Sequence, residues 1–176
     1  CSYSAICFLL VNMLLEEKTL RDKLTNAYNR EFFENNYQRL IETFKSEDMY
    51  FGLAMIDIDN FKNINDSYGH NIGDEILINL VSIINKFSRN DDILIRWGGE
   101  EFIIILKVSS ENRLNVILEN IRKTIEKSKI DKLPTITCSF GGTIYENNEQ
   151  INDTIKRADE ALYIAKANGK NKVILK

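Results

Sequence analysis

Acidic residues that follow apolar segments are the strongest chemical signal in this sequence of 176 residues. Asp57 ends one apolar run, and Glu100 and Glu101 lie in a short turn between two others. Gly98 and Gly99 precede them in that turn and permit a close approach of the backbone to a ligand. If the apolar runs share one sheet, the three carboxylates converge on one edge and repel one another unless a cation binds. Mg²⁺ prefers oxygen ligands and often leaves positions for substrate phosphates. The pattern predicts a metal-assisted phosphate site, and the alternative is a polar hairpin tip with solvated acids.

The composition excludes several other kinds of site. The chain has 23 Lys+Arg against 26 Asp+Glu and a net charge of -3, which argues against a nucleic-acid polymer as partner. A single histidine, His70, leaves no material for a Ser-His-Asp hydrolase or a multi-histidine metal site. The 3 cysteines match no zinc spacing and no disulfide framework, which indicates a reducing compartment. Carboxylates and lysines are therefore expected to carry the chemistry.

Alternating helical and strand patterns predict one α/β (α+β) domain, in which a central sheet of about five strands is flanked by helices. Helices are expected over residues 30–45, 76–87, 114–125 and 155–165, and strands over residues 50–56, 93–97, 102–108, 135–145 and 172–175. Residues 98–101 are expected to form a hairpin turn between two of these strands. The carboxylates thus fall at the ends of strands that a shared sheet places side by side.

Residues 1–19 precede the domain expected over residues 20–176. Residues 5–11 are apolar, but this run is shorter than the roughly 20 residues of a spanning helix. Lys18, Arg21 and Lys23 follow it, as the positive-inside rule expects on the cytoplasmic side. Two interpretations stay open: an amphipathic lead helix, or the truncated end of a stalk or transmembrane helix that tethers the domain upstream of residue 1. The expected location is the cytoplasm, in the second case as the cytoplasmic domain of a membrane-anchored signalling protein.

Several motifs in fixed order resemble those of one family. The turn reads RWGGEEF at 96–102, and the preceding segment reads DIDNFKNIND at 57–66 and YGHNIGD at 68–74. DKLT at 22–25 and NR at 29–30 open the series, and RADEALY at 157–163, AK at 165–166 and GKN at 169–171 close it. In these motifs the chain resembles the GGDEF family, the diguanylate cyclases, in its GGEEF form. The resemblance covers residues 20–176.

The resemblance implies a palm-like nucleotidyl cyclase fold and the condensation of two GTP into cyclic di-GMP and two pyrophosphates. It implies that Asp57, the backbone carbonyl of Ile58, Glu100 and Glu101 bind two Mg²⁺, with Mn²⁺ as the alternative ion. Glu100 and Glu101 are the expected catalytic residues. Glu100 is expected to be the carboxylate that binds metal and helps to deprotonate the ribose 3′-hydroxyl, and Glu101 to share the metal role, with the division of work between the two left open. Because each copy holds one GTP, the resemblance also implies a homodimer.

The guanine-reading residues implied by the resemblance are Asn65 and Asp74. Their chemistry is suitable, because a carboxylate accepts hydrogen bonds from guanine N1–H and N2–H₂, which adenine does not offer together. The alternative for Asp74 is a residue at the N-terminus of the helix expected over 75–87, where it complements the macrodipole.

The remaining substrate contacts implied by the resemblance involve cations and small or aromatic residues. Lys62, Lys166 and Lys170 are expected at the phosphates. Lys170 stands where the family commonly has Arg, which keeps the charge but loses the bidentate fork. The other expected substrate-binding residues are Phe61, His70, Gly98 and Gly99.

The segment 89–92 reads RNDD and occupies the position of the family's inhibitory RxxD site. Arg89 and Asp92 are therefore expected to bind the product, cyclic di-GMP. The alternative is an exposed loop ion pair, which contributes little to stability. Asn120 stands near the position where some members have a further arginine on the next helix.

The sequence as a whole predicts a diguanylate cyclase, a magnesium-dependent and GTP-binding transferase that signals through cyclic di-GMP. The alternative is a non-catalytic GTP or cyclic di-GMP binding module of the same fold. The unaltered GGEEF turn and Asp57 favour the enzyme over the binding module.

Overall fold

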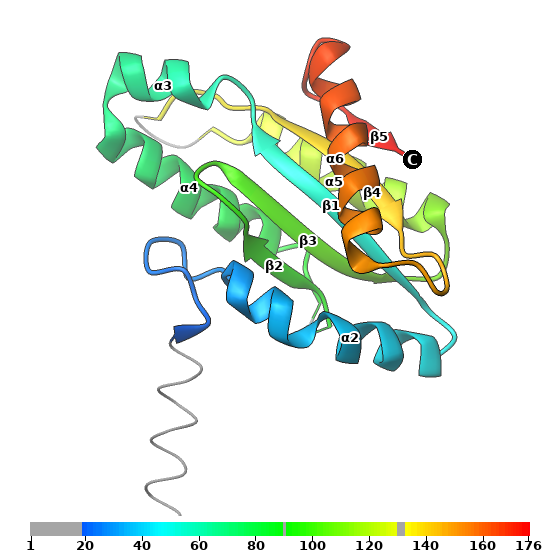
Figure 1. Ribbon diagram of the computed structural model, residues 1–176. Coiled ribbons are helices and arrows are strands. Elements are labelled where there is room, and N and C mark those ends of the chain that lie inside the picture. Colours follow the sequence, from blue (N-terminus) through cyan, green and yellow to red (C-terminus); the bar gives the residue numbers. More distant parts are fainter. Residues whose placement is uncertain (1–18, 90, 130–132) are drawn as a thin grey trace, which may run out of the picture.

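A computed structural model describes residues 19–89, 91–129 and 133–176 of the chain (Figure 1). The expected lead helix or stalk therefore lies outside the described residues, apart from its last position. Within the described ranges, no helix is both long enough and apolar enough to cross a membrane.

The five-stranded sheet expected from the sequence is present, in the order β2-β3-β1-β4-β5. Strand β1 (Tyr50–Ile58) lies at the centre and pairs antiparallel with β3 (Glu101–Val108) and with β4 (Cys138–Ile144). Strand β2 (Ile93–Arg96) pairs with β3, and β5 (Val173–Leu175) pairs parallel with β4. The central position of β1 buries its end between two neighbours, and that end carries Asp57.

Helices cover both faces of this sheet (Figure 1). Helices α2 (Arg30–Ser46) and α6 (Ile151–Ala167) pack on one face, and α4 (His70–Asn85) and α5 (Glu111–Lys127) pack on the other. The short helix α3 (Phe61–Tyr68) follows β1 directly and leads into α4. The α+β architecture with flanking helices is thereby confirmed.

Side-chain alternation along β1 explains the two separate cores. Leu53 and Met55 point to the face covered by α2 and α6, whereas Ala54 and Ile56 point to the face covered by α4 and α5. All four side chains are buried, with exposed fractions of 0–3 %. A strand that is apolar on both faces is expected only in the middle of a sheet covered on both sides.

The structure corrects several expected boundaries. Helix α3 was not expected, because it spans only eight residues and Phe61 is the only buried one among them, although Phe61, Ile64 and Tyr68 fall at helical spacing. Helix α4 begins at His70, six residues before the first expected position, since its first turns are polar. Strand β4 begins at Cys138 rather than at residue 135. Glu101 is the first residue of β3 and not a turn residue.

Helix α6 lies unusually close to β4. A Cβ atom built on Gly141 would lie 2.1 Å from the backbone oxygen of Ala158 and 2.1 Å from the backbone nitrogen of Leu162. Ala161 and Ala165, both fully buried, continue this small-residue face of the helix. The close approach fixes α6 on the sheet and thus fixes where the C-terminal end of the helix projects.

Arg157 of α6 forms an ion pair with Glu149 in the preceding loop and hydrogen bonds with the end of β4. The guanidinium of Arg157 donates to the carboxylate of Glu149 (2.9 Å for Nη2–Oε1), to the backbone oxygen of Ile144 (2.7 Å) and to Thr143 Oγ1 (3.1 Å). Burial opposes ionisation of Glu149, but hydrogen bonds from Arg157, from Thr154 and from the backbone of Glu146 lower its pKa to about 2 from an ordinary 4.5. The charged pair therefore stabilises the folded state at neutral pH.

The substitution Arg157→Ala is expected to lower the free energy of unfolding at pH 7 by about 2 kcal/mol, between the values for exposed and fully buried pairs. Because the folded pKa of Glu149 is depressed, this stabilisation is complete above pH 4.5 and is lost as the pH falls toward 2. Urea unfolding at pH 7, 4.5 and 3 measures it, with the exposed Arg39→Ala as control. A difference between wild type and Arg157→Ala that does not shrink below pH 4.5 would contradict this account.

Candidate active site

Asp57 lies at the buried end of the central strand. Its register partners are Glu101 on β3 and Ser139 on β4, so it sits between two strands that carry polar groups. The residue is 7 % exposed, and the Nζ of Lys166 lies 2.8 Å from its carboxylate. Burial raises the pKa of Asp57, while Lys166 opposes this shift. The sheet thus presents a partly desolvated carboxylate that a nearby cation stabilises in its charged form.

The GGEEF turn is held by an arginine clamp. The guanidinium of Arg96 donates to the backbone oxygens of Gly98 (3.2 Å) and Gly99 (2.8 Å) and to both carboxylate oxygens of Asp22 (3.2 and 3.0 Å). Asp22 in turn accepts hydrogen bonds from the backbone and the hydroxyl of Thr25, each at 2.7 Å. The DKLT motif therefore anchors the turn through Asp22. This role is not evident from the sequence, because Asp22 and Arg96 are 74 positions apart.

The two glutamates of the turn differ in their surroundings. Burial and the neighbouring charge of Asp57 raise the pKa of Glu100, whereas Lys166 opposes the shift and Glu101 adds to it. The carboxylate of Glu101 is directed toward Gly98, since a Cβ atom at Gly98 would lie 2.9 Å from its Oε2. The strand register places Glu101 opposite Asp57, and the charge of Asp57 acts on Glu100, so all three acids lie at this end of the sheet.

The donor set suits Mg²⁺ together with a phosphate ligand. In the part of the chain that the structure describes, no group of three acidic, His or Cys side chains is arranged to hold a metal ion alone. Mg²⁺ is commonly bound through one or two carboxylates plus substrate phosphates, so Asp57 and Glu100 are sufficient protein ligands. Burial and, after it, the charge of Asp57 raise the pKa of Glu100, as expected for an acid that lies beside another acid.

Asn65, on the helix that follows β1, carries a polar atom without a hydrogen-bond partner. Its Oδ1 is buried and is the only buried side-chain nitrogen or oxygen without a hydrogen-bond partner among the described residues. A Cβ atom at Gly73 would lie 2.0 Å from this oxygen, so the glycine makes room for the Asn65 amide. A buried acceptor without a partner costs free energy and indicates a ligand that donates to it.

Asp74 is exposed in the second turn of α4. Because the helix begins at His70, the alternative interpretation of Asp74 as a macrodipole residue at the helix N-terminus is wrong. Its carboxylate is thereby available for a ligand on the α3–α4 side of the site.

The expected phosphate-binding lysines have unequal surroundings. Lys166 pairs with Asp57, and the Nζ of Lys170 donates to Asn60 Oδ1 at 2.5 Å, so both lie at the end of β1. Lys62 and His70 are exposed on α3 and α4. Phe61 is 6 % exposed and packs in the core, so it supports the site as a core residue beside Gly73.

Arg89 and Asp92 line a cavity of about 120 Å³ on a different surface. Asp92 accepts a hydrogen bond from the backbone nitrogen of Arg89 (2.8 Å), and burial raises the pKa of Asp92. In the described part of the chain, the guanidinium of Arg89 forms no ion pair with Asp92, so the expected alternative of a loop ion pair is not realised. The other lining residues are Phe87, Lys107, Arg113, Ile117 and Asn120.

Arg113 is a cation of this cavity that sequence reasoning missed. It stands seven residues before Asn120 on α5, which is two helical turns, so both side chains lie on the same face. The spacing is visible in the sequence, but its meaning depends on which face of α5 meets the RNDD loop.

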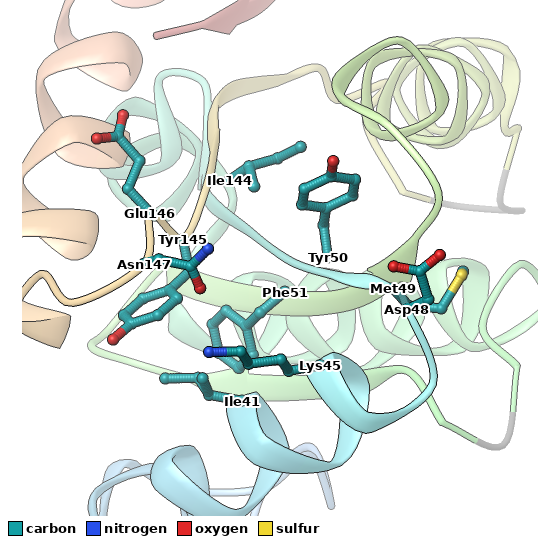
Figure 2. Close-up of a pocket in the computed structure, with 10 residues that line it drawn as sticks. All are labelled: Ile41, Lys45, Asp48, Met49, Tyr50, Phe51, Ile144, Tyr145, Glu146 and Asn147. Atoms are coloured by element: carbon teal, nitrogen blue, oxygen red, sulfur yellow. The ribbon is translucent and has the colours of Figure 1, made fainter.

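A larger cavity of about 520 Å³ lies at the opposite end of β1 (Figure 2). Tyr50, Phe51 and Tyr145 line it together with residues from the C-terminal end of α2. None of the residues expected to bind substrate, metal or product contributes to it.

The fold and the site define a five-stranded α+β domain with paired carboxylates on a glycine-rich turn beside a buried unpaired acceptor. The family described as "Diguanylate cyclase, GGDEF domain" matches residues 19–172, and the chain belongs to this family.

Known relatives and structures agree with this membership. Diguanylate cyclase DgcM of Escherichia coli (strain K12) is 34 % identical over 174 residues, covering 94 % of this chain and 42 % of that protein. The chain thus spans less than half the length of this relative. The coiled-coil and GGDEF domain of DgcB from Caulobacter crescentus in complex with c-di-GMP superposes with a TM-score of 0.88, at 28 % identity, over 98 % of this chain and 95 % of that chain. The active GGEEF domain of a diguanylate cyclase from Vibrio cholerae gives a TM-score of 0.76, at 31 % identity, over 84 % and 96 %.

Proposed function

We propose that this chain condenses two GTP into cyclic di-GMP and two pyrophosphates. The observation that carries this proposal is the strand register, which places Asp57 at the end of the central strand opposite Glu101, beside the GGEEF turn that Arg96 holds. Family membership supports the same reaction. A binding module without turnover has no need for two repelling carboxylates at this edge.

The residues of the site divide the work of the reaction. Bound Mg²⁺, or Mn²⁺ in its place, supplies neutralising charge on the triphosphate, and Asp57, the Ile58 carbonyl and Glu100 are the residues that hold it, with Glu101 as a further ligand. We assign Glu100 as the proton acceptor for the ribose 3′-hydroxyl, because its carboxylate lies on the turn beside Asp57. Lys166 supplies positive charge beside the α-phosphate, where the attack occurs.

The guanine base is assigned to Asn65 and Asp74. The buried Oδ1 of Asn65 gains its missing donor when a base enters, and the Asp74 carboxylate accepts from guanine N1–H and N2–H₂. Since one site holds one GTP, two copies of the chain face each other across the product. We assign this homodimer to the cytoplasm, where GTP is available.

The test is to incubate the protein with GTP and MgCl₂ and to identify the product by mass. Specific activity should rise with protein concentration until the dimer saturates, because each half-site supplies one substrate. A flat concentration dependence in a demonstrably monomeric sample contradicts the two-copy mechanism. Binding of GTP without any dinucleotide product would establish the alternative, a non-catalytic GTP or cyclic di-GMP binding module.

We further propose that the Arg89 cavity binds cyclic di-GMP and inhibits the enzyme, with Arg113 replacing the arginine absent at Asn120. The guanidinium fork suits phosphate and guanine acceptor edges, and the exposed Arg89 is free of any ion pair with Asp92. Arg89→Ala is expected to raise the inhibitory concentration of cyclic di-GMP by about tenfold, the effect of losing one charge-assisted contact, and Arg113→Ala by a similar factor.

Progress curves with and without added cyclic di-GMP measure this effect, with Arg39→Ala on α2 as the control. The initial rates of all three variants should match the wild type, because the cavity shares no residue with the active site. Equal inhibition of wild type and Arg89→Ala would show that the RNDD segment is only a surface loop.

A further inference from the structure

The loop that follows α6 has a strained backbone. Gly169, Lys170 and Asn171 have φ angles of +102°, +62° and +46°, which places three consecutive residues in the left-handed region. Glycine adopts this region freely and asparagine tolerates it, but lysine rarely does. Such strain persists only where surrounding contacts over-determine the conformation, and it often marks a functional segment.

One set of contacts ties this loop to the turn after β1. The backbone nitrogen of Asn171 donates to Asp59 Oδ2 (3.0 Å), and Lys170 Nζ donates to Asn60 Oδ1 (2.5 Å). Asp59 is only 5 % exposed and also accepts hydrogen bonds from the hydroxyls of Thr137 and Ser139, each at 2.7 Å. The buried carboxylate is thus a fixed anchor that lies two residues after Asp57.

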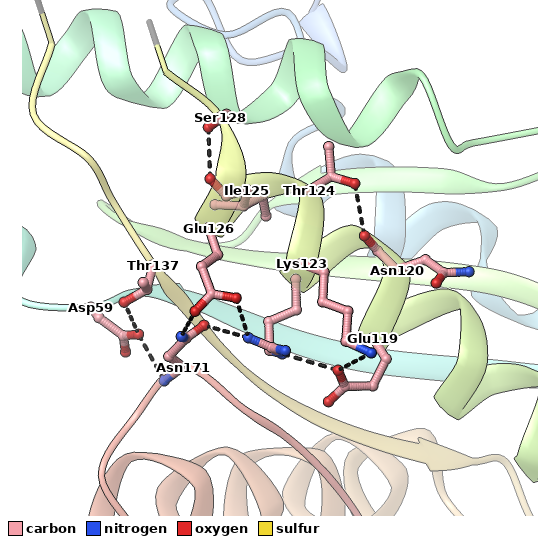
Figure 3. Close-up of polar contacts among 11 residues, drawn as sticks. Asp59, Glu119, Asn120, Lys123, Thr124, Ile125, Glu126, Ser128, Thr137 and Asn171 are labelled. Carbon is pink, nitrogen blue, oxygen red and sulfur yellow. Dashed lines mark hydrogen bonds and ion pairs between the residues drawn. The ribbon is translucent and has the colours of Figure 1, made fainter.

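A second set of contacts ties the same loop to α5 (Figure 3). The Nδ2 of Asn171 donates to Glu126 Oε1 (2.7 Å), and its Oδ1 accepts from Nη1 of Arg122 (2.8 Å). Arg122, with a side chain 12 % exposed, is itself held by Glu126 and Glu119 at 3.1 Å. Both ends of the Asn171 amide are therefore engaged, and the side chain cannot rotate without breaking two bonds.

We propose that Asn171 is a positioning residue for Lys170. The lysine side chain is flexible, so the position of its ammonium depends on the position of the Lys170 backbone and the direction of its Cα–Cβ bond. Asn171 fixes the backbone next to Lys170, because it is bonded to Asp59 on one side and to the Arg122–Glu126 pair on the other. The proposal rests on the proposed function in one respect, which is that Lys170 contacts the GTP triphosphate.

The substitution Asn171→Gly tests the side chain and keeps the left-handed backbone. The matched control is Asn148→Gly, because Asn148 is exposed and has a φ of +69° outside this network. Two quantities are measured: kcat/KM for GTP, and the affinity for 3′-deoxy-GTP, which lacks the attacking hydroxyl and cannot be cyclised. Asn171→Gly is expected to lower both by about tenfold, as losses of supporting contacts commonly do, and Asn148→Gly to leave both unchanged.

The double variant Lys170→Ala with Asn171→Gly separates positioning from general stabilisation. If Asn171 acts through Lys170, the double variant matches Lys170→Ala within about twofold, because coupled residues are not additive. Independent, multiplied losses in the double variant, or an unchanged affinity in Asn171→Gly, would overturn the proposal. A wild type that binds 3′-deoxy-GTP but makes no dinucleotide refutes the cyclase proposal alone, and the affinity comparison still decides the role of Asn171. A wild type that fails to bind the analogue overturns both.

Discussion

Replacing Glu100 with glutamine is expected to lower cyclic di-GMP formation by about 10³-fold, since one change removes a metal ligand and a proton acceptor. The fold should survive, because the Glu100 side chain forms no hydrogen bond or ion pair with the described residues. Burial and, after it, repulsion from Asp57 raise the pKa of Glu100, so its charged form is disfavoured by folding at neutral pH. Glutamine relieves that repulsion, and the variant should be as stable as the wild type or slightly more so.

Product formation by mass, together with urea unfolding at pH 7, measures both halves of this prediction. Glu42→Gln is the matched control, because Glu42 is an exposed glutamate on α2, far from the sheet edge. A folded Glu100→Gln protein that keeps near-wild-type activity would refute the assignment of Glu100 as metal ligand and proton acceptor. A loss of activity accompanied by unfolding would instead mean that Glu100 serves the fold.

The second large effect concerns the base. The wild type is expected to prefer GTP over ITP in kcat/KM by about 10²-fold, because inosine lacks the 2-amino donor and leaves an acceptor of the site unpaired. Asp74→Ala should lower activity with GTP to the level with ITP and abolish the preference. The physical reason is that alanine cannot accept hydrogen bonds from N1–H and N2–H₂, the donors that distinguish guanine.

Initial rates with both nucleotides decide this prediction. Glu75→Ala is the control, because Glu75 is the adjacent exposed acid on α4. If Asp74→Ala still discriminates between GTP and ITP as the wild type does, the guanine-reading role belongs to other residues. An equal loss in both acidic variants would indicate a general electrostatic effect.

The parts of the fold that the sequence predicted are those with local signals. The periodicity of apolar residues located α2, α5, α6 and all strands to within a few residues, and the GGEEF turn appeared between β2 and β3 as expected. Helix α3 escaped prediction because it spans only eight residues and buries only Phe61, so its apolar residues Phe61, Ile64 and Tyr68 are too few to define a helix. Apolar periodicity indicates buried helices, and a short helix with one buried residue gives only a weak signal.

The parts of the site that the sequence did not predict depend on long-range contacts. Arg96 meets Asp22 across 74 positions, and Asn171 meets Asp59 across 112. Both pairs lie within recognisable motifs, so the residue types were visible while their partners were not. The strand register that places Glu101 opposite Asp57 is likewise a long-range feature that local sequence patterns do not show.

The order of the site along the chain has a consequence for synthesis. Asp57 and the turn are translated long before Lys166, Lys170 and Asn171, and Lys170 meets Asn60 across 110 positions. A nascent chain that has emerged only as far as β4 therefore carries Asp57, Asp59 and the glutamates of the turn. It still lacks Lys166 and Lys170, and it lacks Asn171, whose backbone nitrogen donates to Asp59. The charge balance of the site is completed only when its last residues leave the ribosome, so catalytic competence is expected to arise late and in one step.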